Sequence, residues 1–188
     1  MTRITPIVVA LTLLAAPLAA QTAEPSATTA TYGNWTVTCT PATVAGTATP
    51  QKMCQMTTKL NLKGNDGQVR PLLEVALGMP PGGDAPRIVV QVPTDVALRE
   101  ALVVSVDAET AGTDPKPQTD LLTASYFACT GTGCIADAAL KSDVIAALKA
   151  AKTTNVTFTA LAGAKKITVP VEMTGFGDAW AALGLPKP

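Results

Sequence analysis

The cysteines are the side chains of this sequence with the widest choice of chemistry, and they occur without any histidine. The absence of an imidazole excludes Ser-His and Cys-His nucleophiles, histidine metal sites and histidine pH switches. A redox-active pair usually has two residues between its cysteines and a basic neighbour, whereas four residues separate the second pair here and no basic group is nearby. Neither pair has the short spacing of a zinc knuckle. The four positions are Cys39, Cys54, Cys129 and Cys134.

A copper site is one alternative for part of this set. Met53, Cys54 and Met56 are close together in the sequence, and thioether and thiolate groups are soft ligands that suit copper(I). A strand that buries sulfur-containing side chains explains the same residues more simply. We therefore expect the cysteines to be structural.

The first twenty residues are typical of a secretory signal peptide. Arg3 supplies a positive start, residues 7–14 form an apolar run, and small residues follow as far as Ala20. The apolar run is shorter than the roughly 20 residues that a membrane-spanning helix needs, and no later stretch reaches that length. We expect cleavage after Ala20 and a periplasmic or secreted location.

Export to an oxidising compartment makes disulfides the expected state of the four cysteines. Four cysteines permit three pairings. We favour the local scheme, Cys39 with Cys54 and Cys129 with Cys134, because the two glycines within residues 130–133 allow a short loop to bend tightly.

Length and composition indicate one folded domain. The chain has 188 residues, of which 47% are hydrophobic and 15% are charged, which is enough apolar material for a packed core. The small, polar residues 21–31 are expected to form a flexible tether, residues 32–185 the domain and residues 186–188 a tail. Fourteen basic and fourteen acidic residues cancel, so we expect no nucleic-acid partner.

The remaining polar residues do not form a recognisable catalytic site. Ser105 and Ser125 lie within strand-like patterns, and Ser142 suits the N-cap of a helix, so none is placed as the nucleophile of a Ser-Lys enzyme. Asp107 and Glu109 could face one side of a strand as paired carboxylates do in glycosidases, but a solvated turn is the commoner setting. We expect no catalytic, cofactor-binding or metal-binding residue.

Alternation of apolar and polar side chains predicts a mainly β domain. Short strands at this spacing, separated by Gly/Pro/Asn/Asp turns, favour an antiparallel β-sandwich. One or two short helices are expected at residues 142–151 and 176–183. Trp35 and Trp180 are expected to pack in or beside the core rather than to stack on a sugar. The expected strands are residues 35–40, 53–62, 72–77, 87–92, 102–106, 124–129, 156–160 and 166–173.

Two segments resemble a known family. The run from Tyr32 to Cys39 reads Tyr-Gly-Asn-Trp-Thr-Val-Thr-Cys, and Phe127 to Cys134 reads Phe-Ala-Cys-Thr-Gly-Thr-Gly-Cys. Their order and spacing within residues 32–185 resemble the invasion-associated locus B (IalB) family. The resemblance implies an exported protein of Gram-negative bacteria with an immunoglobulin-like β-sandwich, and the founding member is associated with host-cell invasion. The family pattern contains no established catalytic residue. Residues 40–52 form a long insert relative to this pattern.

The sequence therefore predicts an exported, non-enzymatic protein of the periplasm or cell surface. Such a protein would hold a protein partner, in the envelope or on a host cell, through its loops or a sheet edge. No cofactor is expected. The alternatives are a periplasmic thiol or copper-handling protein, or an enzyme with an unrecognised site.

Overall fold

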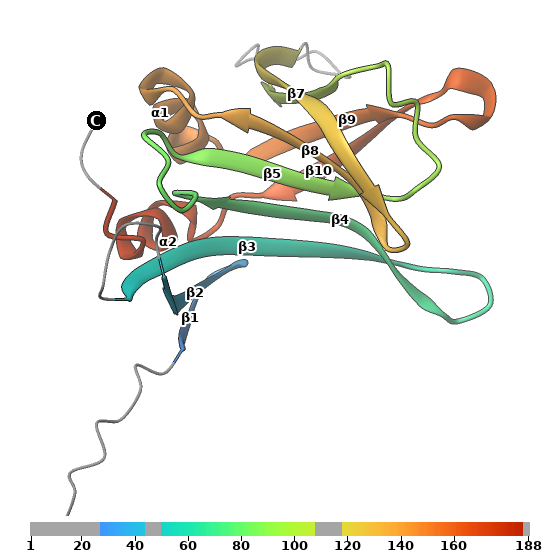
Figure 1. The fold of residues 1–188 in the computed structure, drawn as a ribbon. Helices are drawn as coiled ribbons and strands as arrows, with labels where there is room; N and C mark the ends of the chain where they lie inside the picture. The colour runs from blue at the N-terminus through green and yellow to red at the C-terminus, as the bar shows by residue number, and fades with distance from the viewer. Residues whose placement is uncertain (1–26, 44–49, 108–117, 186–188) are drawn as a thin grey trace, which may run out of the picture.

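The structure is a computed structural model that describes residues 27–43, 50–107 and 118–185. The expected signal peptide at residues 1–20, the start of the expected tether and the expected tail at residues 186–188 lie outside the described residues. The described part contains ten strands, two α-helices and one 3₁₀ helix (Figure 1). In chain order they are β1 (Thr28–Tyr32), β2 (Trp35–Ala42), β3 (Gln51–Lys63), β4 (Val69–Gly78), β5 (Arg87–Val92), β6 (Leu102–Asp107), β7 (Gln118–Thr130), β8 (Gly133–Ala139), α1 (Ser142–Ala150), β9 (Thr153–Thr159), η1 (Ala162–Ala164), β10 (Lys166–Glu172) and α2 (Phe176–Ala182).

The ten strands join one sheet in the order β1-β2-β3-β4-β5-β8-β7-β6-β9-β10. Every pair of neighbouring strands is antiparallel. The prediction of a mainly β fold with antiparallel strands and short helices is therefore confirmed, and each strand expected from the sequence is present.

Two further strands, β1 and β8, were not expected. β1 begins at Thr28, so the folded part starts before the predicted boundary at Tyr32. Four of its five side chains are exposed and show no hydrophobic alternation; instead, a two-residue turn with Gly33 at a φ of 56° places it against β2. β8 is rich in alanine, which has a low strand propensity, and its pairing with β5 and β7 holds it in the sheet.

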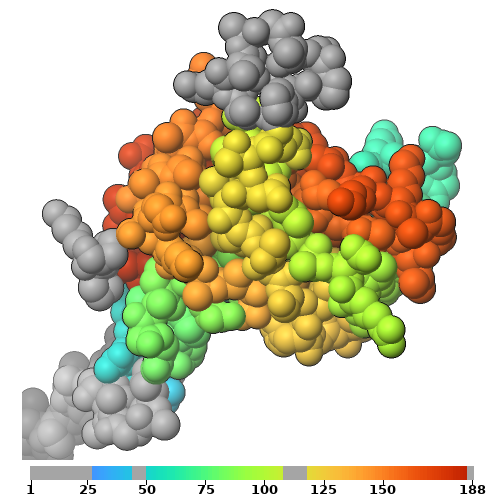
Figure 2. Space-filling view, turned by 90° about the horizontal axis from the view of Figure 1, so that it is seen from above, coloured from blue at the N-terminus to red at the C-terminus, as the bar shows by residue number. Residues whose placement is uncertain are grey.

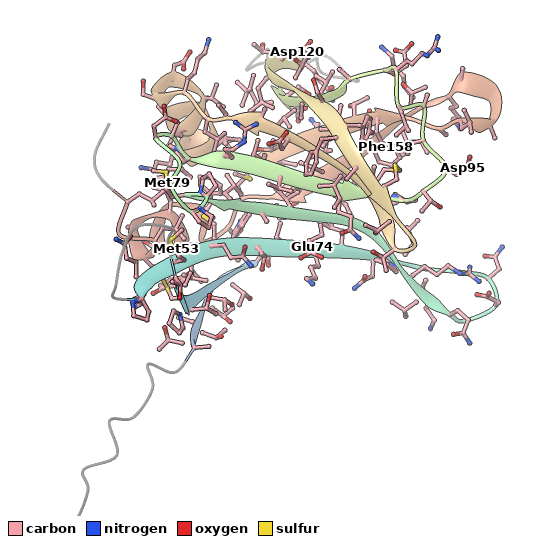
Figure 3. The ribbon with its side chains drawn as sticks, viewed as in Figure 1. Met53, Glu74, Met79, Asp95, Asp120 and Phe158 are labelled. Carbon is pink, nitrogen blue, oxygen red and sulfur yellow. A yellow bond between two sulfur atoms is a disulfide. The ribbon has the colours of Figure 1, made fainter. Side chains whose placement is uncertain are left out.

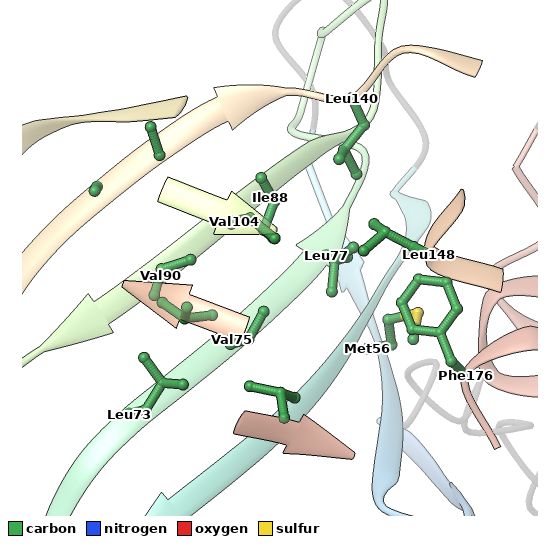
Figure 4. Packing of buried hydrophobic residues seen from close by; sticks show 14 of the residues in the cluster. Met56, Leu73, Val75, Leu77, Ile88, Val90, Val104, Leu140, Leu148 and Phe176 are labelled. Atoms are coloured by element: carbon green, nitrogen blue, oxygen red, sulfur yellow. The ribbon is translucent and has the colours of Figure 1, made fainter. Parts of the chain in front are cut away.

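The sheet bends at β7, and its two halves share one core. The first part of β7 pairs with β6 and its second part pairs with β8. Leu77 and Ile88, from β4 and β5, line the same small internal cavity of about 20 Å³ as Val104 and Val156, from β6 and β9. Figure 4 shows Leu77, Ile88 and Val104 from the two halves of the sheet in this shared core, together with Phe176 of α2. A cavity of this size leaves the core close-packed.

The two helices cover one end of this core. Val144, Ile145 and Leu148 of α1 are buried, as their spacing predicts. The expectation that Ser142 caps α1 is wrong: Ser142 is the first helical residue, and the extended residue Lys141 precedes it without a side-chain capping bond. Backbone hydrogen bonds and the buried stripe therefore define this helix start without a polar cap.

Candidate functional site

All four cysteines form disulfides. Cys39 is bonded to Cys54 and Cys129 to Cys134, which is the pairing favoured from the sequence. Each bond joins two residues that lie directly opposite one another on neighbouring strands, β2 with β3 and β7 with β8. Each disulfide therefore fixes the register of the two strands that it joins.

The structure does not bring the three sulfur atoms of the possible copper site together. The sulfur of Cys54 is bonded to Cys39 and is not a thiolate. Met56 is fully buried in the core. Met53 is adjacent to Cys54 in an extended strand and faces the other side of the sheet. No group of three or more His, Cys, Asp or Glu side chains suited to a metal ion occurs among the described residues.

The polar residues singled out in the sequence make contacts within the sheet. Ser105 is buried and its hydroxyl donates to Gln118 Oε1 at 3.1 Å. Asp107 Oδ1 accepts a hydrogen bond of 2.8 Å from Asn155 Nδ2, whereas Glu109 lies outside the described residues. Both Ser105 and Asp107 therefore have local partners that connect neighbouring strands.

The two tryptophans belong to one aromatic cluster with Phe176. Trp35 is buried, as expected, and its ring meets that of Phe176 edge-on at 5.1 Å. Trp180 stacks on Phe176 at 6.1 Å and is partly exposed. Lys149 Nζ lies 5.7 Å from the Trp180 ring centre, so this ring is engaged by α1 rather than freely presented to solvent.

A groove of about 430 Å³ lies on the outer face of the sheet. It is formed by the side chains of β2 to β5 and β8 that point away from the core, together with residues 79–81 after β4. Figure 3 shows Met53 and Met79 at the end of the sheet where the helices lie. We call this surface the β4–β5 groove. Its defining residues are Thr38, Met53, Ala76, Gly78, Met79, Pro80, Arg87, Val89 and Asp137.

Small side chains explain why the sheet is hollow here. Ala76 and Gly78 alternate along β4 with the core residues Val75 and Leu77. The two small residues, Ala76 and Gly78, therefore face outward. A Cβ added at Gly78 would lie 2.9 Å from the backbone oxygen of Cys54. The groove therefore depends on close contact between the backbones of β3 and β4. This alternation of small outward residues with large inward ones is visible in the sequence of β4 and is the signal by which the groove could have been predicted.

Arg87 and Asp137 are the charged residues among those that line the groove, and they form an ion pair. Arg87 Nε and Nη2 lie 2.6 Å and 2.5 Å from Asp137 Oδ2. The side chains are 39% and 25% exposed, respectively. Because the two charges face each other, they present a local dipole beside an apolar floor rather than a free nucleophile or general base. A polar pair beside an apolar floor is an arrangement that can orient a bound group.

No helix among the described residues is long and apolar enough to span a membrane.

Comparisons with known proteins identify the family. The model of the family described as invasion associated locus B (IalB) protein matches residues 35–184. The crystal structure of invasion associated protein B from Bartonella henselae has a TM-score of 0.61 and 21% sequence identity, over 83% of this chain and 94% of that chain. At this identity the likeness concerns the fold. No curated protein sequence matches the chain. Since the family model covers most of the chain, including both disulfides, the chain belongs to the IalB family.

Proposed function

We propose that this protein is an exported, non-enzymatic protein of the periplasm or cell surface, and that it holds a protein partner in the β4–β5 groove. Two disulfides support an oxidising location. Membership of the IalB family supports a role in interactions within the envelope or with a host cell. We also infer that the bent sheet forms an immunoglobulin-like β-sandwich, because residues of both halves share one core.

The composition of the β4–β5 groove carries the proposal. The floor of the groove consists of small apolar residues, and its rim includes the flexible side chains of Met53 and Met79. The ion pair of Arg87 and Asp137 lies at its side. Methionine adapts its shape to apolar partner side chains. A partly exposed Arg–Asp pair can orient a partner through its remaining hydrogen-bonding capacity. A protruding apolar side chain flanked by polar groups is the partner chemistry that fits.

Site-specific photo-crosslinking in the native envelope tests the groove. A photoreactive amino acid at Met53 places the probe on the groove rim, and one at the exposed Thr123 of β7 places it outside the groove. We expect a discrete, reproducible crosslinked protein from position 53 and none from position 123. Equal crosslinking from both positions, or none from position 53, would contradict the groove as the binding site.

A charge exchange separates recognition from stability. Arg87→Asp combined with Asp137→Arg keeps an opposite-charge pair and reverses its direction. If the pair orients the partner, the double variant is folded and yet loses the crosslink from position 53. Retention of the crosslink at the parental level would limit the role of Arg87 and Asp137 to holding β5 against β8.

A further inference from the structure

Among the residues that the structure describes, the exposed large hydrophobic side chains lie toward one end of the sheet, remote from the β4–β5 groove. Each of these residues has more than half of its surface exposed to solvent. They are Leu62, Val69, Leu98, Phe127 and Leu161. Leu62, Val69, Leu98 and Leu161 lie in, or within two residues of, a connection between strands, whereas Phe127 lies inside β7, three residues before that strand ends.

Strand register shows that these residues share one end. Lys63 pairs with Val69 across the β3–β4 connection, and the end of β5 pairs with the start of β8 through Val92 and Cys134. The end of β9 pairs with the start of β10 through Thr159 and Lys166. The β3–β4, β5–β6, β7–β8 and β9–β10 connections therefore lie at the same end, as Figures 1 and 2 show for the projecting β3–β4 and β9–β10 hairpins.

Hydrogen bonds hold these connections together. Leu161 N donates to Asp95 O at 3.1 Å, and Ala97 N donates to Thr159 O at 2.8 Å, which joins the β5–β6 and β9–β10 connections. Gln91 Nε2 donates to Thr132 O at 3.3 Å and joins β5 to the β7–β8 turn. The β5–β6 and β9–β10 connections, which carry Leu98 and Leu161, are therefore braced against each other. We call the end that carries the exposed apolar side chains the loop-tip surface.

Basic residues accompany the apolar ones at the loop-tip surface. Lys63 directly follows Leu62, Arg70 follows Val69 and Arg99 follows Leu98 in the sequence. Arg70 is paired with Asp66 at 2.5 Å. The cations at this end are Lys63, Arg70, Arg99, Lys165 and Lys166, and the described carboxylates are Asp66, Asp95 and Glu100. The full sequence has no net charge, so this positive excess is local.

We propose that the loop-tip surface docks on an anionic phospholipid bilayer. Apolar side chains that enter the headgroup region and neighbouring cations that attract anionic lipids are the two components of interfacial membrane binding. Leu62 and Val69, Leu98, and Leu161 belong to three different connections, and Leu62, Val69 and Leu98 are each followed in the sequence by lysine or arginine. A protein interface would instead favour a contiguous core depleted of lysine, whereas a fluid bilayer accommodates separate protrusions. Docking at this end leaves the β4–β5 groove free.

Vesicle binding by the purified mature protein tests the proposal. We expect binding to phosphatidylcholine vesicles that contain phosphatidylglycerol, with weaker binding to pure phosphatidylcholine and at high salt. Each removed cation should weaken partition by about fivefold. Leu98→Asp with Leu161→Asp should weaken it at least as much as the loss of two cations. Both positions are exposed, so the fold should be retained.

A matched control places the same charges at the other end. Ala146 of α1 and Ala181 of α2 are exposed, and Ala146→Asp with Ala181→Asp should leave vesicle binding unchanged. Leu98→Trp should introduce a tryptophan whose emission brominated lipid chains quench if the loop-tip surface enters the bilayer. Absence of vesicle binding, equal binding to both lipid compositions, or undiminished binding by the Leu98/Leu161 variant would overturn the proposal. These outcomes are independent of the groove crosslink from position 53.

Discussion

Gly33 and Gly175 place two backbone segments in direct contact, although the residues are far apart in the sequence. A Cβ on Gly175 would lie 2.1 Å from Tyr32 O, and one on Gly33 would lie 2.4 Å from Thr174 O. Asn34 N donates to Thr174 O at 3.1 Å in the same place. The contact joins the β1–β2 turn to the residue that precedes α2, so it attaches the first hairpin to the last helix.

Substitution of either glycine should be strongly destabilising. Gly175 has a φ of 83°, where an L side chain is strained, and the added methyl group also meets backbone. We expect Gly175→Ala to lower the free energy of unfolding by about 3 kcal/mol, measured by urea denaturation. Gly184→Ala is the matched control, because φ is 64° but no atom lies within 4 Å of the added Cβ; its cost should be only about 1 kcal/mol. Equal costs would show that the backbone contact contributes nothing.

Removal of the two disulfides should have unequal effects. Their sequence separations are 15 for Cys39–Cys54 and 5 for Cys129–Cys134. In the loop-entropy model, replacing both cysteines by alanine should cost about 3 kcal/mol for the first pair and about 2 kcal/mol for the second. Urea denaturation of the two double variants measures this order. Thiol titration of the native parent should detect no free thiol, and two or more reactive thiols would contradict the structural role.

Phe176 should be one of the most costly positions to truncate. Its side chain is 1% exposed and lies between Trp35 and Trp180. Phe176→Ala should lower the free energy of unfolding by about 3–5 kcal/mol, because it leaves a cavity between α2 and β2. The partly exposed Trp180 provides the comparison, and Trp180→Ala should cost less. A red shift of Trp35 emission in the folded Phe176 variant would report solvent entry into this part of the core.

The Arg87–Asp137 pair should contribute little to stability. Since the Arg87 side chain is 39% exposed, solvent screens the interaction, and Asp137→Asn should cost less than about 1 kcal/mol. Arg87→Asp alone should be less stable than the parent because two carboxylates then face each other. Adding Asp137→Arg should recover most of that loss. A double-mutant cycle in urea measures the interaction, and a cost of several kcal/mol would indicate that the pair is effectively buried.

Tyr126 should make the protein less stable at alkaline pH. Burial raises its pKa above the ordinary value, and its hydroxyl has no hydrogen-bond partner among the described residues. Below about pH 10 the phenol is neutral in both states. Above it, the unfolded chain ionises first, so the free energy of unfolding falls with rising pH. Tyr126→Phe should remove this part of the alkaline loss without lowering stability at neutral pH, as urea denaturation at both pH values would show. An unchanged pH dependence would contradict the assignment.

Local patterns were sufficient for much of the fold. The alternation of side chains along β5 predicts where this strand begins and ends. The spacing of Val144, Ile145 and Leu148 predicts the buried face of α1. Side-chain periodicity reports secondary structure directly because one face of each element is buried. β1 was missed for the converse reason: its side chains are mostly exposed, and only backbone pairing with β2 orders it.

The candidate surfaces depend on contacts that no local pattern encodes. Met53, Val89 and Asp137 are on three different strands, and they line one groove only because β3, β4, β5 and β8 are neighbours in the sheet. In the same way, Leu62, Leu98 and Leu161 reach one end through the register of separate hairpins. By itself the sequence determined the strands other than β1 and β8, the absence of histidine chemistry and a resemblance to the IalB family. Tertiary structure decided which outward side chains meet, because long-range strand order sets their positions.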